Sequence, residues 1–249
     1  TEADSGGLPP AGDPARGSES GSSSELASRL HSVQAGIAAA ARSAGRSPDE
    51  LTLIVVTKFH PSGLVRELAA LGVRDLGENR HQEAQAKAAE LADLDLRWHF
   101  IGQLQTKKAR QAAQYAHAIH SIDRERLVDA LATAEVPRPI EAFVQVNLTE
   151  DPGRGGAPPA EIERIAERVL STPTLRLRGV MAVAPLPEEE AAASAFARLR
   201  GYAERLRSVA PDATAISAGM THDYPEAIAA GATHLRIGSA ITGNRPAAR

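Results

Sequence analysis

The side chain best placed for covalent chemistry is Lys58, which ends the apolar segment Leu51–Lys58. The chain has only four lysines and uses arginine for most of its positive charge, so a lysine at the end of a buried strand is unusual here. A neutral amine can attack a carbonyl, whereas a guanidinium effectively cannot. Burial penalises the charged amine and favours the neutral amine, which is the nucleophile. We therefore predict a Schiff base on Lys58, with extension into solvent as the alternative.

Two segments of small and hydroxyl-bearing residues have the composition of anion-binding loops. Each follows an apolar segment, and they are Ser217-Ala218-Gly219-Met220-Thr221 and Gly238-Ser239. Small residues let backbone N–H groups approach a phosphate, hydroxyls add donors, and a helix N-terminus favours negative charge. Either segment alone could be a plain turn, but the two together predict a phosphate site.

An amine opposite a phosphate site is the arrangement that pyridoxal 5′-phosphate requires. Its aldehyde would bond to Lys58, its phosphate would lie between the two loops, and an arginine or aspartate would face its ring nitrogen. Arg236 could take that last position. A permanently charged arginine disfavours protonation of the pyridine nitrogen and so weakens the ring as an electron sink. The alternative for Arg236 is an ordinary ion pair with a carboxylate.

The elements that must position these residues alternate between two kinds of pattern. Short segments rich in β-branched residues predict strands at Leu51–Lys58, Val73–Glu78, Arg97–Ile101, Ala118–Ile122, Ala142–Asn147, Leu177–Ala184, Thr214–Ser217 and Thr233–Ile237. Helical patterns lie between them at Ser62–Leu71, Arg80–Leu91, Thr106–Tyr115, Arg124–Ala134, Pro159–Leu170, Glu188–Val209 and Pro225–Ala230.

This alternation predicts an α/β fold of parallel strands joined by right-handed crossovers. Eight such units in 249 residues fit a single (β/α)8 TIM barrel. An open doubly wound sheet normally has fewer strands, and no GxGxxG follows the first strand. In a barrel the functional residues lie where strands end, and phosphates often bind after strands seven and eight, where both small-residue loops fall.

An extra helix is predicted before the barrel. Residues 1–23 are dominated by Gly, Pro and Ser and predict a disordered tail, which leaves residues 24–249 as one barrel domain. Ser22-Ser23-Ser24-Glu25 resembles a capping box. Helical spacing then continues through Leu26, Leu30, Val33 and Ile37 and should end near Gly45.

Composition narrows the possible function classes. Lys plus Arg total 28 against 31 Asp plus Glu, a formal charge of −3, so nucleic acid is not expected as a partner. The absence of cysteine excludes disulfides, thiolate metal sites and a cysteine nucleophile. We find neither a membrane span nor a signal peptide in the sequence and expect a cytoplasmic protein with no membrane partner. The helices show no clear apolar patch, which favours a monomer.

Five motifs in order resemble the YggS/PROSC family of pyridoxal phosphate homeostasis proteins. They are Val55-Val56-Thr57-Lys58, Leu76-Gly77-Glu78-Asn79, Trp98-His99-Phe100-Ile101-Gly102 with Leu104-Gln105, Gly219-Met220-Thr221 with Asp223, and Arg236-Ile237-Gly238. The similarity extends from about Glu25 to Arg245. It implies a barrel like the N-terminal domain of alanine racemase and a carrier or regulator of vitamin B6 without an established reaction.

The resemblance also assigns individual residues. It implies an internal aldimine on Lys58, the ring-nitrogen arginine at Arg236, and Asn79 near the cofactor. The family's phosphate-binding positions map onto Ser217, Gly219, Met220, Thr221, Gly238 and Ser239. Apoenzymes that depend on pyridoxal phosphate would be possible partners.

Two enzymatic alternatives remain open at this point. An amino acid racemase would use the same Schiff base, but it benefits from a second acid/base, which alanine racemases take from a separate C-terminal domain. Here the sequence ends just after strand eight, and of the tyrosines only Tyr224 follows a strand-end loop. A Schiff-base aldolase acting on a sugar phosphate would need no pyridoxal phosphate.

Three histidines are further candidates for the site. His99 could face the cofactor or be a hydrogen-bonded core residue. His117 and His120 are three positions apart on a predicted strand and should face opposite sides, so we expect no shared metal.

Overall fold

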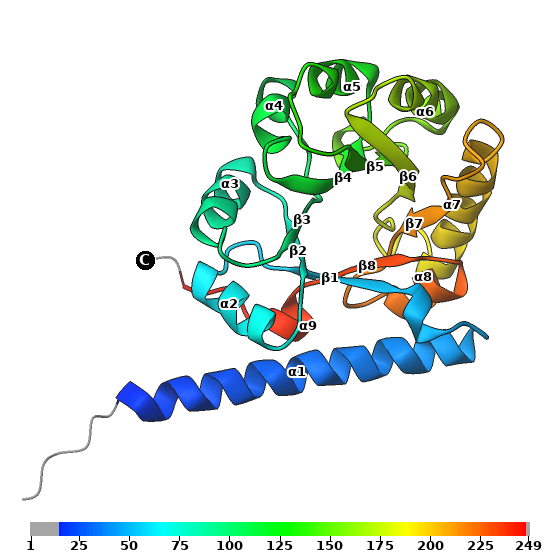
Figure 1. The fold of residues 1–249 in the computed structure, drawn as a ribbon. Coiled ribbons are helices and arrows are strands. Elements are labelled where there is room, and N and C mark those ends of the chain that lie inside the picture. The colour runs from blue at the N-terminus through cyan, green and yellow to red at the C-terminus, as the bar shows by residue number, and fades with distance from the viewer. Residues whose placement is uncertain (1–14, 248–249) are drawn as a thin grey trace, which may run out of the picture.

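The strands close into a ring in chain order, from β1 to β8, and each is parallel to both neighbours (Figure 1). This computed structural model describes residues 15–247, and the strands in that range are β1 Thr52–Val56, β2 Asp75–Glu78, β3 Arg97–Phe100, β4 Ala116–Ile122, β5 Ile140–Gln145, β6 Leu175–Met181, β7 Ala215–Ser217 and β8 His234–Ile237. All eight predicted strands are present, and the predicted TIM barrel is confirmed.

Helices surround the barrel on its outer side (Figure 1). They are α1 Ala15–Ser43, α2 Ser62–Ala70, α3 His81–Glu90, α4 Ala109–Ala112, α5 Glu125–Ala132, α6 Ile162–Leu170, α7 Ala192–Leu206, α8 Tyr224–Ala229 and α9 Ser239–Thr242, with 3₁₀ turns at Pro48–Glu50, Thr106–Lys108, Pro152–Arg154 and Pro159–Glu161. The sequence predicts every helix from α1 to α8, although α4 is shorter than expected. It missed α9, whose four residues are too few for a periodic pattern.

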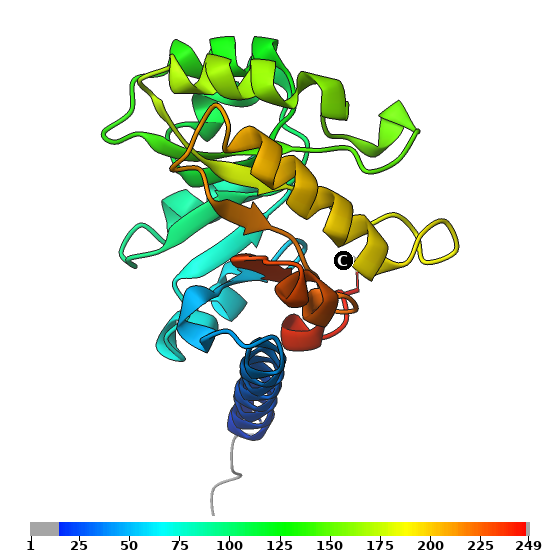
Figure 2. The same cartoon turned by 90° about the vertical axis from the view of Figure 1, so that its right-hand side faces the viewer.

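The extra helix α1 lies outside the ring, along the β8–β1 side of the barrel (Figure 2). Leu26, Leu30, Val33 and Ile37 are buried as predicted, and the helix ends two residues before Gly45, which has a φ of +69°. Two arginines bond α1 and the turn after it to the helices beside them. Arg29 Nε donates to the Ile241 carbonyl of α9 at 2.7 Å, and Arg46 Nη1 donates to the Ile228 carbonyl of α8 at 2.8 Å. Among residues 15–247, no helix has both the length and the apolar character needed to cross a membrane.

The N-terminal boundary of α1 differs from the prediction. The helix begins at Ala15, so residues 15–23 are helical where the sequence predicts a disordered tail, and residues 1–14 of that tail lie outside the described range. Once a helix is nucleated, each further residue adds a hydrogen bond at little cost. The Ser-rich stretch therefore continues the helix instead of capping it at residue 24.

The interior of the barrel is unusually polar. An apolar layer is formed by Ala118, Phe143, Met181 and Ala215. The remaining interior space holds polar groups, among them the buried side chains of His99, His120, His234, Ser217 and Arg236. Because buried polar groups are costly unless they are paired, these side chains must satisfy one another.

Two glycines provide a matched test of the barrel packing. A Cβ on Gly179 in β6 would lie 1.7 Å from the Ala215 carbonyl oxygen of β7, whereas a Cβ on Gly201 in α7 would meet nothing within 4 Å. We expect Gly179→Ala to lower the free energy of unfolding by about 2–3 kcal/mol, because backbone atoms must move apart. Gly201→Ala should raise it by up to about 1 kcal/mol through helix propensity. Denaturant titration measures both, and similar effects in the two variants would contradict this account.

Candidate functional site

The residues predicted to carry the chemistry come together at one mouth of the barrel. Lys58 follows β1, Asn79 follows β2, and the two small-residue loops follow β7 and β8. These four strands are consecutive neighbours in the closed order. Since the strands are parallel, their C-terminal ends all open onto the same mouth. The predicted set therefore lines one continuous half of that mouth.

Lys58 is exposed, which corrects the predicted burial of its amine. Strand β1 ends at Val56, and the buried Thr57 is the last residue before the chain reaches the surface. Ile54 pairs in register with the interior Arg236, and side chains alternate along a strand, so Lys58 continues the set of positions that face the barrel axis. Among the described residues, no acidic side chain lies within ion-pair distance of its amine.

The buried lysine of this chain is Lys87, which the sequence analysis did not single out. Its side chain is 6% exposed. Its Nζ donates to Glu78 Oε1 at 2.6 Å and to the Thr57 carbonyl at 2.8 Å, and the Thr57 hydroxyl donates to the same Oε1 at 2.7 Å. Burial raises the pKa of Glu78, while Lys87 acts against that effect. This network joins the ends of β1 and β2 to α3 directly below Lys58 and Asn79.

Lys87 could have been found from the helical pattern. The buried residues of α3 are His81, Ala84 and Lys87, at spacings of three residues, so the lysine occupies an apolar position of the helix. Its amine is already bonded to a carboxylate and points between the barrel and α3. It is therefore engaged in structure and not available at the mouth.

The turn after Lys58 is held by Phe59. Phe59 has a φ of +68°, the only positive φ outside glycine among the described residues. Its N–H donates to Glu83 Oε1 at 2.7 Å, and its ring is contacted by the guanidinium groups of Arg80 and Arg245, at 4.9 and 3.8 Å from the centroid. These contacts stabilise a conformation that a bulky side chain rarely adopts.

Arg236 is a buried cation with no carboxylate partner. It is 3% exposed, and no acidic group lies within ion-pair distance among the described residues. Nη1 donates to Ser217 Oγ at 2.6 Å and Nη2 to the Ala182 carbonyl at 3.0 Å, whereas Nε has no acceptor there. Burial lowers the pKa of Arg236 to about 10, so the guanidinium is charged at neutral pH. The alternative of an ordinary ion pair is therefore not what the structure contains.

The loop after β7 lies beside β8, because the backbone N–H of Arg236 donates to the Gly219 carbonyl. The Gly219 φ is +101°, and a Cβ there would lie 2.9 Å from Ala227. The N–H of Met220 is occupied by Asp223 Oδ1 at 2.7 Å. In α9, the N–H groups of residues 241 and 242 bond to the Gly238 carbonyl, which leaves those of Ser239 and residue 240 as free donors.

Two predicted residues differ from the rest in their contacts. Ser217 is fully buried, and its hydroxyl is shared between Arg236 and His120, so its side chain serves the arginine and not an open loop. The side-chain oxygen of Asn79 is buried without a hydrogen-bond partner in the described part of the chain. A Cβ on Gly102 would lie 2.2 Å from the Asn79 carbonyl, so the two strand-end segments are in direct contact.

The histidines occupy the barrel interior, and one expectation about them is wrong. His99 is a hydrogen-bonded core residue, the second of its two predicted possibilities. His117 and His120 do not face opposite sides, because their rings lie 5.6 and 5.1 Å from that of His99. The β3–β4 register shifts at this point, and the irregularity turns the extra residue His117 inward. Within residues 15–247, no cluster of three or more His, Asp or Glu side chains is arranged to hold a metal.

The tyrosine side chains contact α1, His81 and Arg205. A Cβ on Gly36 of α1 would lie 2.3 Å from the Tyr224 hydroxyl, so that hydroxyl packs against the outer helix. Tyr115 Oη is hydrogen-bonded to His81 at 3.1 Å, and Tyr202 stacks beneath Arg205. None of the three contributes an acid/base group next to Arg236.

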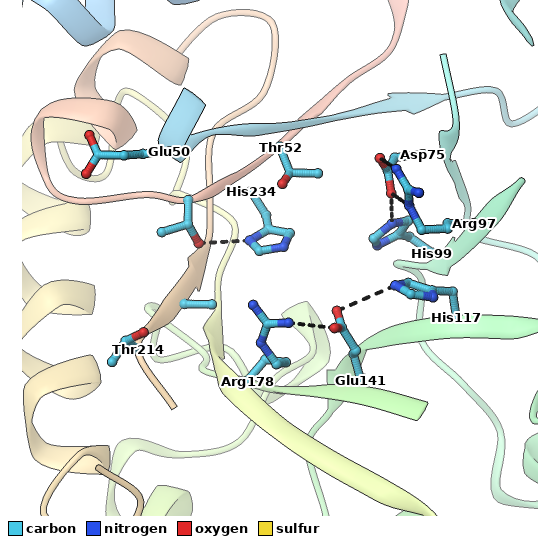
Figure 3. A pocket seen from close by; sticks show the side chains of 12 residues that line it. Glu50, Thr52, Asp75, Arg97, His99, His117, Glu141, Arg178, Thr214 and His234 are labelled. Atoms are coloured by element: carbon cyan, nitrogen blue, oxygen red, sulfur yellow. Dashed lines mark hydrogen bonds and ion pairs between the residues drawn. The ribbon is translucent and has the colours of Figure 1, made fainter. Parts of the chain in front are cut away.

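A cavity of about 410 Å³ opens at the opposite, N-terminal mouth (Figure 3). Two carboxylates in it are each paired with an arginine: Asp75 with Arg97 at 2.8 Å and Glu141 with Arg178 at 2.5 Å. His99 also lines this cavity and points toward Asp75 (Figure 3). This cavity is distinct from the candidate site, and of its lining residues the sequence offers only His99 as one that could face the cofactor.

Comparisons with known proteins agree on one family. The family model for the alanine racemase N-terminal domain matches residues 29–246. A pyridoxal phosphate homeostasis protein of Pseudomonas aeruginosa is 43% identical over 227 residues, a match that covers 89% of this chain and 96% of that protein. The structure of PipY from Synechococcus elongatus with PLP bound is 35% identical with a TM-score of 0.72, and covers 88% of this chain and 100% of that one. Alanine racemase from Corynebacterium glutamicum shares the fold at 15% identity and a TM-score of 0.65, over 88% of this chain and 60% of that one.

Replacing the buried lysine tests the network below the mouth. We expect Lys87→Met to lower the free energy of unfolding by about 3 kcal/mol, because it leaves the Glu78 carboxylate buried without its cation. The loss should shrink as pH falls. Burial raises the pKa of Glu78, so the folded protein binds that proton more readily than the unfolded chain.

The control is Lys107→Met, which removes an exposed lysine and should change the free energy of unfolding by less than about 0.5 kcal/mol. Denaturant titrations at neutral and mildly acidic pH compare the two. A Lys87→Met penalty that grows toward acidic pH would argue against a charged Glu78–Lys87 pair.

Proposed function

We propose that this chain, a member of the YggS/PROSC group of pyridoxal phosphate homeostasis proteins, binds pyridoxal 5′-phosphate and keeps the supply of that cofactor in balance. The group lies within the alanine racemase N-terminal domain family. Two findings support the proposal: a relative is named pyridoxal phosphate homeostasis protein, and the similar structure of PipY has PLP bound. The remaining support comes from the chemistry of the mouth residues. In this proposal the protein holds and releases the cofactor without turning over a substrate.

The observation that carries the proposal is the buried guanidinium of Arg236. A cation buried without a carboxylate is costly unless a ligand or dipoles stabilise it. Its Nε–H lacks an acceptor among the described residues and is a suitable donor to an unprotonated pyridine nitrogen. With its pKa about 10, Arg236 stays charged at neutral pH, and its positive charge disfavours protonation of that nitrogen.

Lys58 is the proposed covalent anchor. Its neutral Nζ would attack the aldehyde carbon, the C=O bond would become C=N, and water would leave with the oxygen. Of the four lysines, Lys87 is bonded to Glu78, and Lys107 and Lys108 follow β3, outside the β7–β8–β1–β2 half of the mouth. Exposure leaves the Lys58 amine accessible to an incoming cofactor, and its strand position directs it toward the barrel axis.

The loops after β7 and β8 would hold the phosphate. Free N–H donors at Ser239, hydroxyls at Thr221 and Ser239, and the close backbone approach allowed by Gly219 and Gly238 suit an anion. Met220 lies in the loop after β7, and its side chain is exposed. Asn79, whose side-chain Oδ1 has no hydrogen-bond partner among the described residues, would accept a hydrogen bond from the cofactor.

The absence of turnover is proposed on two grounds. A charged Arg236 weakens the pyridine ring as an electron sink, and no tyrosine among the described residues is placed as a second acid/base at the mouth. Transfer to apoenzymes, a cytoplasmic location and a monomeric state stay predictions from the sequence.

Trapping with borohydride tests the covalent anchor. Reduction turns a Schiff base into a stable secondary amine, so peptide mapping should place the pyridoxyl group on Lys58. Lys58→Arg should abolish the trapped product and the yellow absorbance while keeping the positive charge. Lys107→Arg, at an exposed lysine elsewhere, should leave both unchanged. A pyridoxyl group on another lysine of the wild-type protein would overturn the assignment.

Isotope exchange at Cα distinguishes a carrier from a racemase. We expect purified protein loaded with pyridoxal 5′-phosphate to exchange the α-hydrogen of alanine no faster than free cofactor does. Exchange that is well above this background and is lost in Lys58→Arg would support the racemase alternative instead. A colourless protein with no trapped pyridoxyl group would favour a sugar-phosphate aldolase.

A further inference from the structure

A continuous chain of hydrogen bonds runs through the barrel from the N-terminal cavity to Arg236. Asp75 Oδ1 is 2.8 Å from His99 Nε2, and His99 Nδ1 is 2.9 Å from His120 Nε2. His120 Nδ1 is 2.8 Å from Ser217 Oγ, which is 2.6 Å from Arg236 Nη1. All the members except Asp75 are buried. Its members come from β2, β3, β4, β7 and β8, so the chain of hydrogen bonds crosses the barrel interior.

With both histidines neutral, the donors and acceptors along the chain can all be ordered in one direction. Arg236 can only donate, so Ser217 Oγ accepts and its own hydrogen is free to point at His120. Burial is the main cause that lowers the pKa of His120 well below its usual value. A neutral His120 accepts from Ser217 at Nδ1 and donates from Nε2 to His99. His99 then donates from Nε2 to Asp75.

The chain ends on a negative charge. Burial acts against ionisation of Asp75, but the hydrogen bonds from Arg97 and His99 hold its pKa well below its usual range. Each bond in the chain has its donor on the Arg236 side and its acceptor on the Asp75 side. Bonds aligned in this way polarise one another, so the oxygen facing Arg236 becomes a better acceptor.

We propose that Asp75, His99, His120 and Ser217 form a relay that positions Arg236 for the cofactor ring. The members are positioning residues, since only Arg236 would touch the ring. No proton needs to move along the chain; its polarity alone orients the guanidinium. This inference rests on the proposed function and adds a set of residues distant from the mouth.

The test separates the ring end of the ligand from the phosphate end. Pyridoxine 5′-phosphate carries the ring and the phosphate but an alcohol in place of the aldehyde, so it binds without a Schiff base. Inorganic phosphate probes the loops after β7 and β8 alone. A relay acting through Arg236 should affect the first ligand and spare the second, whereas general loosening of the fold would affect both.

The N-terminal cavity offers a matched pair of variants. Asp75→Asn removes a carboxylate paired with Arg97, and Glu141→Gln removes one paired with Arg178, but only Asp75 is bonded to the relay. We expect Asp75→Asn to weaken pyridoxine 5′-phosphate binding about tenfold, the scale of one hydrogen bond to a charged group, with phosphate binding unchanged. Glu141→Gln should change neither. Equal effects of the two variants, or equal loss of both ligands in Asp75→Asn, would overturn the relay.

A double variant tests whether the effect travels along the chain. In a His120→Gln background the relay is already broken, so adding Asp75→Asn should weaken binding by less than about twofold. If His120→Gln does not fold, Ser217→Ala breaks the chain one bond later. A full tenfold loss that persists in the broken background would mean that Asp75 acts through space and not through the histidines.

The outcomes also separate this inference from the proposed function. If wild-type protein is trapped on Lys58 while Asp75→Asn behaves like Glu141→Gln, only the relay is wrong. If wild-type protein neither binds pyridoxine 5′-phosphate nor is trapped, the proposed function fails and the relay with it.

Discussion

The interaction on which the mouth depends is the burial of one unpaired cation. Arg236 has no carboxylate within ion-pair distance among the described residues, and its charge is held by a hydroxyl, a carbonyl and the polarised histidines behind the hydroxyl. A barrel interior filled with aliphatic side chains could not supply these groups. The polar groups of this core, including its closely spaced histidine rings, are what allow a guanidinium to be buried beneath the mouth.

A second constraint acts on the lysine side of the mouth. Lys58 itself is free, but the residues around it are not: Thr57 is tied to Glu78 and Lys87, and Phe59 is clamped by Glu83 and two arginines. The backbone that carries the amine is thus rigid although the amine is exposed. Such an arrangement suits a group that must meet an incoming molecule in a reproducible position.

The sequence predicts the barrel, its strands and the residues at one half of the mouth, because strand periodicity and strand ends are local properties. It does not predict the burial of individual side chains. The sequence suggests a buried Lys58 and gives no notice of the buried Lys87, since burial depends on which helix covers which strand. The inward turn of His117 depends on a register shift between β3 and β4, and the role of Asp75 depends on contacts with residues distant in sequence.

Barrel closure has a consequence for the newly made protein. The mouth combines residues that follow β1 and β2 with residues that follow β7 and β8, and β1 pairs directly with β8. The first and last strands of the barrel must therefore meet before the phosphate loops and Lys58 face each other. A nascent chain on the ribosome that lacks its last strand has no complete pocket, so loading with vitamin B6 must wait until translation has passed β8.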